Sequence, residues 1–126
     1  MIQSAKPRKQ RLFRYNAPNH TRQKFVRAHI SKELAKKLGI KKRSIRVRRG
    51  DTVRIMSGAS KGKSGKVTAV ELRRAVILIE GITRKNAKGR ELQIPISASN
   101  VYVTDLDLTN KLRSAMIEAA KVQVQK

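Results

Sequence analysis

Apolar and polar residues alternate in the middle of the chain. Val53 and Ile55 are separated by single polar residues, the period of two expected of a strand with one buried face. Further short apolar runs follow, divided by turn residues about every 8 to 12 positions. They lie at residues 66–72, 75–79, 91–96 and 101–104. These short strands within residues 50–106 predict a mainly β fold, a small barrel.

Two of the connections in this segment are basic. Arg73 and Arg74 are predicted to form a tight turn between adjacent strands. Residues 83–89 are predicted to form a longer loop, which carries Arg84, Lys85 and Lys88.

Residues 107–126 are predicted to form a C-terminal helix. Leu108, Leu112, Ala115, Met116 and Ala119 recur at spacings of three and four, which places them on one apolar face of an amphipathic helix. Either Thr109 or Asn110 could cap its start.

The first half of the chain has weaker periodicity. Residues 1–18 show no helical or alternating pattern, so we expect a basic tail that is disordered when free and extended when bound. Residues 19–49 are expected to be a basic extension with two short helices. Asn19 could cap the first, which would run to about His29, and Ser31 could cap the second, with Glu33 near its positive end and Gly39 as its stop.

The charge of the chain indicates the class of partner. Thirty-one lysines and arginines stand against eight acids, a formal net charge of +23, and residues 1–50 contain seventeen of these cations but only one acid, Glu33. Such a chain repels itself unless a polyanion neutralises it, so nucleic acid is the leading partner. An anionic membrane is a weaker alternative, because the sequence has neither a convincing membrane-binding amphipathic helix nor a lipidation signal. We expect a soluble cytoplasmic protein without signal peptide or membrane span.

The sequence offers no convincing catalytic or metal site. It has no cysteine, and its two histidines, His20 and His29, lack neighbouring carboxylates. Asp51 is better explained by a turn or cap than by acid–base catalysis, because no motif gives it a catalytic partner. A small RNA-processing enzyme would need such a set of residues, so we predict no enzyme and no cofactor.

Residues 57–66, SGASKGKSGK, form a glycine- and lysine-rich loop between two predicted strands. Glycines permit positive φ angles and leave backbone N–H groups uncovered, so phosphates could approach while the lysines supply charge. The alternative is a flexible turn with solvated lysines, and the net charge favours phosphate binding. A nucleotide-binding P-loop would need glycine at Ser57 and a helix after Ser64, where Val67 and Val70 predict a strand.

Two sets of motifs resemble known families. The run GDTVRIMSGASKGKSGKV at residues 50–67 resembles the KOW motif of several ribosomal proteins and of transcription elongation factors. RKQR at 8–11, YNAPNHTRQK at 15–24, SKELAKK at 31–37 and SIR at 44–46 resemble the universal large-subunit ribosomal protein twenty-four in its archaeal and eukaryotic form. The short ending, residues 123–126, is similar to the archaeal branch.

This resemblance implies an SH3-like barrel bound to the 5′ domain of large-subunit ribosomal RNA near the polypeptide exit tunnel, with a role in early subunit assembly. It implies neighbouring ribosomal proteins as further partners, with no small-molecule substrate and no homo-oligomer. The alternative is a KOW-type module that binds RNA or polymerase during transcription elongation.

The predicted RNA contacts combine the basic N-terminal half, the glycine- and lysine-rich loop and the basic connection at 83–89. Tyr15 is included because an aromatic ring can stack on a base, although only 3% of the residues are aromatic, which favours recognition of RNA shape and phosphates. The full set is Lys6, Arg8, Lys9, Arg11, Arg14, Tyr15, Asn16, His20, Arg22, Lys24, Arg27, Lys32, Lys36, Lys37, Arg46, Arg48, Arg49, Ser60, Lys61, Gly62, Lys63, Lys66, Arg84, Lys85 and Lys88.

Overall fold

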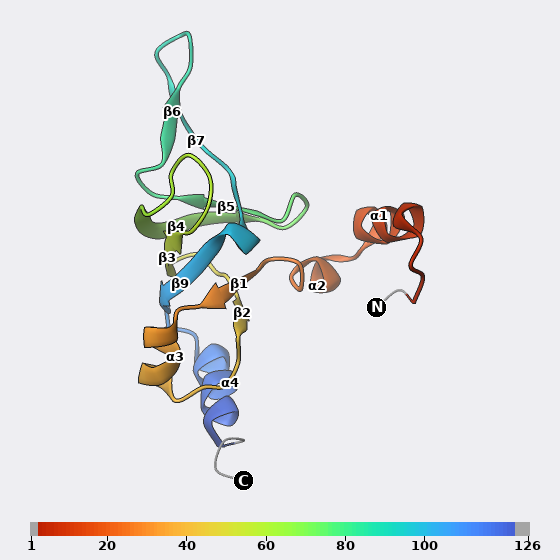
Figure 1. Ribbon diagram of the computed structural model, residues 1–126, viewed down its shortest axis with the longest axis vertical. Helices are drawn as coiled ribbons and strands as arrows, with labels where there is room; N and C mark the ends of the chain where they lie inside the picture. Colours follow the sequence, from red (N-terminus) through yellow and green to blue (C-terminus); the bar gives the residue numbers. More distant parts are fainter. Residues whose placement is uncertain (1–2, 123–126) are drawn as a thin grey trace.

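One curved sheet organises the molecule (Figure 1). Within residues 3–122, which the computed structural model describes, seven strands are hydrogen-bonded in the order β2-β1-β9-β3-β4-β5-β8, and β6 and β7 form a separate two-stranded sheet. The mainly β, barrel-like fold predicted from the sequence is confirmed. The strands are β1 (Arg27–Ile30), β2 (Ser44–Arg46), β3 (Thr52–Ile55), β4 (Ser64–Glu71), β5 (Val76–Ile79), β6 (Thr83–Lys85), β7 (Glu91–Gln93), β8 (Ile96–Ser97) and β9 (Val101–Asp105), with a short 3-10 helix, η1 (Ala98–Asn100), before β9.

The alternating residues of the middle segment form the core. Val53 and Ile55 of β3 and Ile77 and Ile79 of β5 are buried together with Val67 of β4. β3 pairs antiparallel with both β4 and β9, while β4 pairs antiparallel with β5. The predicted tight turn at Arg73 and Arg74 lies between β4 and β5, as expected. The run at 91–96 is divided into β7 and β8 rather than forming one strand.

Gly65 explains how closely β4 approaches the neighbouring β5. A Cβ atom at this position would lie 2.7 Å from the carbonyl oxygen of Glu80 and 2.7 Å from a methyl group of Ile79. Both distances are far below van der Waals contact, so the packing of β4 against this end of β5 requires glycine.

The predicted helix from Asn19 to His29 is wrong. Helix α2 (Asn19–Arg22) has only four residues, begins after Pro18 rather than with Asn19 as its cap, and is followed by strand β1. Val26, Ala28 and Ile30 are buried and alternate with exposed residues, and β1 pairs in parallel with β9 and antiparallel with β2. The sheet therefore extends into the segment before residue 50.

The N-terminal segment contains a helix, α1 (Pro7–Asn16), where the sequence predicted an extended chain. Pro7 at its first turn has a φ angle already suited to a helix, and the following Arg, Lys, Gln and Leu residues have good helix propensity. None of its residues is buried, and Figure 1 shows α1 and α2 standing away from the barrel. The helix contacts the segment just before β1 through Phe25, whose ring packs edge to face against Phe13 at 6.3 Å between centroids.

The second predicted helix is confirmed as α3 (Lys32–Leu38). The Ser31 hydroxyl accepts a hydrogen bond from the Leu34 amide at 3.2 Å, and Gly39 ends the helix in the left-handed conformation. Leu34 is buried against the core, and this contact ties α3 to the sheet.

The C-terminal helix is confirmed as α4 (Lys111–Val122), but its predicted buried face is wrong. Asn110 caps it, because its Oδ1 accepts from the amides of Leu112 and Arg113. Arg113, Ile117 and Ala120 face the core. Leu112 and Met116, which the spacing placed on the apolar face, are 76% and 50% exposed. Residues 123–126, whose short ending resembled the archaeal branch, lie outside the described residues.

Candidate nucleic-acid interface

The predicted contacts in the N-terminal arm, residues 6–24, lie mostly on an open surface. On or beside α1, the exposed residues are Lys6, Arg8, Lys9, Arg11, Arg14, Tyr15 and Asn16. His20 on α2 and Lys24 just after it are also exposed. Arg22 is partly buried and donates from Nη2 to the carbonyl of Tyr15 at 2.8 Å, which joins α2 to the end of α1. The arm thus presents many cations with little apolar burial of its own.

The loop between β3 and β4 differs from the predicted phosphate cradle in one respect. Gly58 and Gly62 have positive φ angles of 96° and 87°, as the sequence suggested. However, the amides of Lys61, Gly62 and Lys63 donate to carbonyls of Gly58, Ile55 and Ser60, respectively. These three amides are therefore not available to phosphate, whereas the side chains of Lys61, Lys63 and Lys66 are exposed and available to an anion.

The predicted basic loop at 83–89 is a hairpin rather than an irregular connection. β6 pairs antiparallel with β7, and every residue of both strands is exposed. Arg84 and Lys85 lie on β6 and Lys88 lies in the turn. Figure 1 shows this hairpin projecting from the barrel, so its cations can contact a partner that the barrel itself does not touch.

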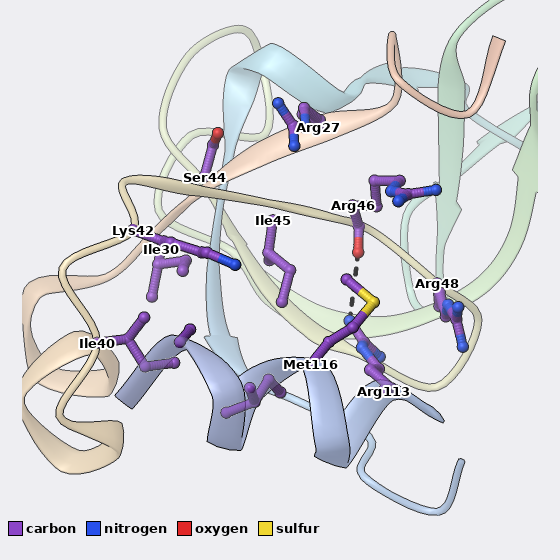
Figure 2. Close-up of a pocket in the computed structure, with 12 residues that line it drawn as sticks. Arg27, Ile30, Ile40, Lys42, Ser44, Ile45, Arg46, Arg48, Arg113 and Met116 are labelled. Atoms are coloured by element: carbon purple, nitrogen blue, oxygen red, sulfur yellow. Dashed lines mark hydrogen bonds between the residues drawn. The ribbon is translucent and has the colours of Figure 1, made fainter. Parts of the chain in front are cut away.

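Residues 46–49 form a fourth basic segment, and a buried ion pair holds it in place. Arg113 donates from Nη1 and Nη2 to the two carboxylate oxygens of Asp51, at 2.5 and 2.7 Å. Its Nη2 also donates to the carbonyl of Arg46 at 3.3 Å, the dashed contact in Figure 2, where Arg113 rises from α4 toward the chain at Arg46. Asp51 in turn accepts from the amides of Arg48, at 2.8 Å, and Asp107, at 3.1 Å.

This ion pair was not predicted from the sequence. The turn role predicted for Asp51 is confirmed, but its side chain is completely buried and its charge is matched by Arg113, sixty-two residues later. Arg113 lies four and seven residues before the buried Ile117 and Ala120, a spacing that places all three on one helix face, and this is the signal that could have pointed to a buried arginine.

Asp107 lies between β9 and α4, where Thr109 supplies two hydrogen bonds to its carboxylate. The hydroxyl and the amide of Thr109 both donate to Asp107 Oδ1, and these hydrogen bonds hold the pKa of Asp107 below its ordinary value. The carboxylate therefore stays charged and fixes the turn between β9 and α4.

The predicted contacts are not gathered on one patch. Figure 1 shows the β6–β7 hairpin and α3, which carries Lys32, Lys36 and Lys37, on opposite sides of the barrel along the long axis. Arg27 lies on β1 between them. Rather than lining one pocket, these cations form several separate basic regions, a distribution typical of proteins that bind a large polyanion at many points.

Neither a metal site nor a membrane span is found within residues 3–122. No group of three or more His, Cys, Asp or Glu residues is placed there to hold a metal ion. His29 packs edge to face on the ring of Tyr102, at 5.7 Å between centroids. Among the helices described, none is long and apolar enough to cross a bilayer.

Comparison with known proteins identifies the family. The model of the family that unites the eukaryotic L26 ribosomal proteins with their archaeal counterparts matches residues 4–120. A protein of Pyrobaculum islandicum named "Large ribosomal subunit protein uL24" is 47% identical over 118 residues, which cover 94% of each chain. Proteins with the same name from Methanocella arvoryzae and Methanothrix thermoacetophila are 43% and 47% identical, over 94% and 87% of this chain and 94% and 93% of their own.

These matches confirm the resemblance to ribosomal protein twenty-four and the prediction that the protein is not an enzyme, and they do not favour the transcription alternative. Because the family model covers nearly all of the chain, the protein belongs to the family of eukaryotic L26 ribosomal proteins and their archaeal counterparts.

Proposed function

We propose that this protein is a structural constituent of the large ribosomal subunit in the cytoplasm and that it binds ribosomal RNA through its basic segments. The names of the relatives place those proteins in the large subunit. The observation that carries the RNA contact is the exposed N-terminal arm, whose helix α1 has no buried residue and no acid in its first turn. A chain with a formal charge of +23 gains most from a partner that is itself a dense polyanion.

The proposed mechanism is neutralisation of phosphates together with ordering of the arm. A ten-residue helix is marginal in water when it lacks tertiary contacts, so RNA would supply the stabilisation that the barrel does not. Release of condensed counterions from the RNA drives association, and the barrel fixes where residues 46–49, the loop between β3 and β4 and the β6–β7 hairpin lie relative to one another.

The finer location is also a proposal. By its resemblance to the family, the protein binds the 5′ domain of large-subunit RNA near the polypeptide exit tunnel, contacts neighbouring ribosomal proteins and acts early in assembly. An early-acting protein must bind RNA that carries no other protein. Its affinity for a bare transcript of the 5′ domain should therefore exceed its affinity for a transcript of equal length from another domain.

A pair of matched double variants tests the RNA contact. Arg8→Gln with Arg11→Gln removes two exposed charges from the arm, whereas Arg73→Gln with Arg74→Gln removes two from a turn that was not predicted to touch RNA. In titrations of a 5′-domain transcript, the arm variant should flatten the plot of log affinity against log salt by about 0.7 for each phosphate that is no longer neutralised, or about 1.4 in all. The turn variant should leave the slope unchanged.

Deleting residues 1–18 should weaken binding and flatten the slope further. An unchanged slope after this deletion would contradict the proposed interface. Fractionation of a cell lysate on a sucrose gradient tests the location: the protein should migrate with large subunits. Migration with RNA polymerase instead would favour the elongation module.

A further inference from the structure

A cleft lies between residues 46–49 and strand β4. Its volume is about 510 Å³. Arg46, Arg48 and Arg49 line one side, the hydroxyl-bearing Thr68 lies on β4, and no acidic residue lines it. Val26, Val47 and Val70, which also line it, are buried or packed against the core, so the base of the cleft is apolar.

The arginine side of this cleft is held by the interior of the protein. Arg113 binds the carbonyl of Arg46, and Asp51 binds the amide of Arg48, so the backbone that carries the three arginines is fixed from behind. Arg46 is held further by a hydrogen bond from Nη1 to Gln23 Oε1 at 3.2 Å. Because this backbone and the Arg46 side chain are already held, the binding of a ligand costs less conformational entropy than it would on a mobile loop.

The chemistry of the cleft matches a single nucleotide. A nucleobase offers an apolar face that can pack on valines or stack on a guanidinium plane, while its phosphate offers the anion that arginines bind. Pockets of about 300 to 1,000 Å³ accept ligands of this size. A base within a continuous helix is stacked on both faces and cannot enter, so the nucleotide must be unpaired.

We propose that the cleft between residues 46–49 and β4 binds one unpaired nucleotide of the RNA, such as a bulged base. The proposal rests on the RNA binding proposed above and adds a preference to it. The arm, the loop and the hairpin contact the phosphate backbone, whereas this cleft distinguishes a helix with an extruded base from a continuous helix.

Two RNA hairpins test the proposal with the full chain. They are identical except that the stem of one contains a single unpaired uridine. In fluorescence anisotropy titrations, the protein should bind the bulged hairpin at least about ten-fold more tightly than the paired one. This ratio corresponds to about 1.4 kcal/mol, which is within the range of base stacking on a protein side chain. Equal affinity for the two hairpins would overturn the proposal.

Ala69→Leu is designed to obstruct the cleft. Ala69 lines it and is exposed on β4, so a larger side chain is accommodated without disturbing the core. This variant should bind both hairpins with the affinity that the unmodified protein has for the paired one. Ala119→Leu makes the same change on the exposed side of α4 and should retain the preference. Arg48→Gln is a second variant, and it should weaken binding of the bulged hairpin more than binding of the paired one.

The outcomes separate this proposal from the broader one. If both hairpins bind equally and their affinity falls with salt, the protein binds RNA but the cleft does not select an unpaired base. If neither hairpin binds, the RNA-binding function itself fails. A labelled acidic peptide that binds more tightly than the bulged hairpin, and loses affinity in the Ala69→Leu variant, would assign the cleft to a protein partner and overturn the proposal.

Discussion

Replacing Arg113 with methionine tests whether the buried ion pair holds the barrel and the C-terminal helix together. Methionine keeps much of the length and apolar character of the side chain but removes both hydrogen bonds to Asp51. The Asp51 carboxylate would then be completely buried with only the two backbone amides of Arg48 and Asp107 as partners. Breaking a buried pair by removing one partner costs about 3 to 5 kcal/mol, because an uncompensated charge remains in the interior.

That cost is a large fraction of the stability of a small domain, which is about 5 to 15 kcal/mol. At about 4 °C per kcal/mol for a chain of this size, the melting temperature should fall by roughly 12 to 20 °C. Urea denaturation, followed by circular dichroism, measures the free energy of unfolding without adding salt to a highly charged protein. The matched control is Arg74→Met. Arg74 pairs with Glu71 at 3.6 Å on the surface, and this change should cost less than about 1 kcal/mol.

A double-mutant cycle isolates the contribution of the pair from that of the surrounding hydrogen bonds. Asp51→Asn alone leaves the Arg113 charge buried opposite a neutral amide, whereas Asp51→Asn with Arg113→Met removes both charges. The losses in free energy of unfolding of the two single variants should therefore add up to about 2 kcal/mol more than the loss in the double variant. The reasoning is refuted if Arg113→Met is no more destabilising than Arg74→Met, or if the costs of the two single variants simply add.

Three smaller changes test other local interactions. Gly65→Ala should lower the free energy of unfolding by about 1 to 3 kcal/mol, because the added methyl group would overlap the backbone at Glu80; retention of full stability in urea would contradict this close approach. Ser31→Ala removes the side-chain cap of α3 and should cost about 1 kcal/mol in the same assay, and a cost near zero would show that the cap contributes nothing. Thr109→Val removes the hydroxyl that binds Asp107 and should raise the pKa of that carboxyl toward its ordinary value, as followed by NMR. Because the folded pKa of Asp107 is lowered, its stabilising effect is present above about pH 4 and is lost as the pH falls through the lowered pKa; an unaltered titration in the variant would exclude the hydroxyl as the cause.

The parts of the fold that could be predicted from the sequence are those with strong local signals. Val53 and Ile55 alternate with polar residues and lie on β3. Helix α3 begins after Ser31, whose hydroxyl caps it, and ends at Gly39, which can adopt the left-handed conformation. Such signals act within a few residues, so they survive in any tertiary context. The positive charge of the N-terminal half is likewise a property of composition, and no fold could remove its need for an anionic partner.

The wrong helix before residue 30 has a partner distant in sequence as its cause. Residues 27–30 were predicted to be partly helical, yet β9 offers them an unpaired edge about seventy positions later, and that pairing decides their conformation. In the loop at 57–63, the glycines were correctly predicted to adopt positive φ. Only the folded structure shows that the amides of residues 61–63 are already bonded to nearby backbone carbonyls.

The class of fold, the charge and the family follow from the amino-acid sequence alone, because alternation, capping residues, net charge and motifs can be read locally. The buried face of α4 and the way the arginines at 46–49 are held depend instead on long-range packing. A periodic stripe of leucine, methionine and alanine predicts an apolar face. However, pairing the buried Asp51 carboxylate with a cation stabilises the fold more than burying Leu112 would. The helix therefore turns Arg113 inward. Electrostatic pairing in the interior overrides the periodicity of the helix because the cost of a bare buried charge exceeds the gain from burying one apolar side chain.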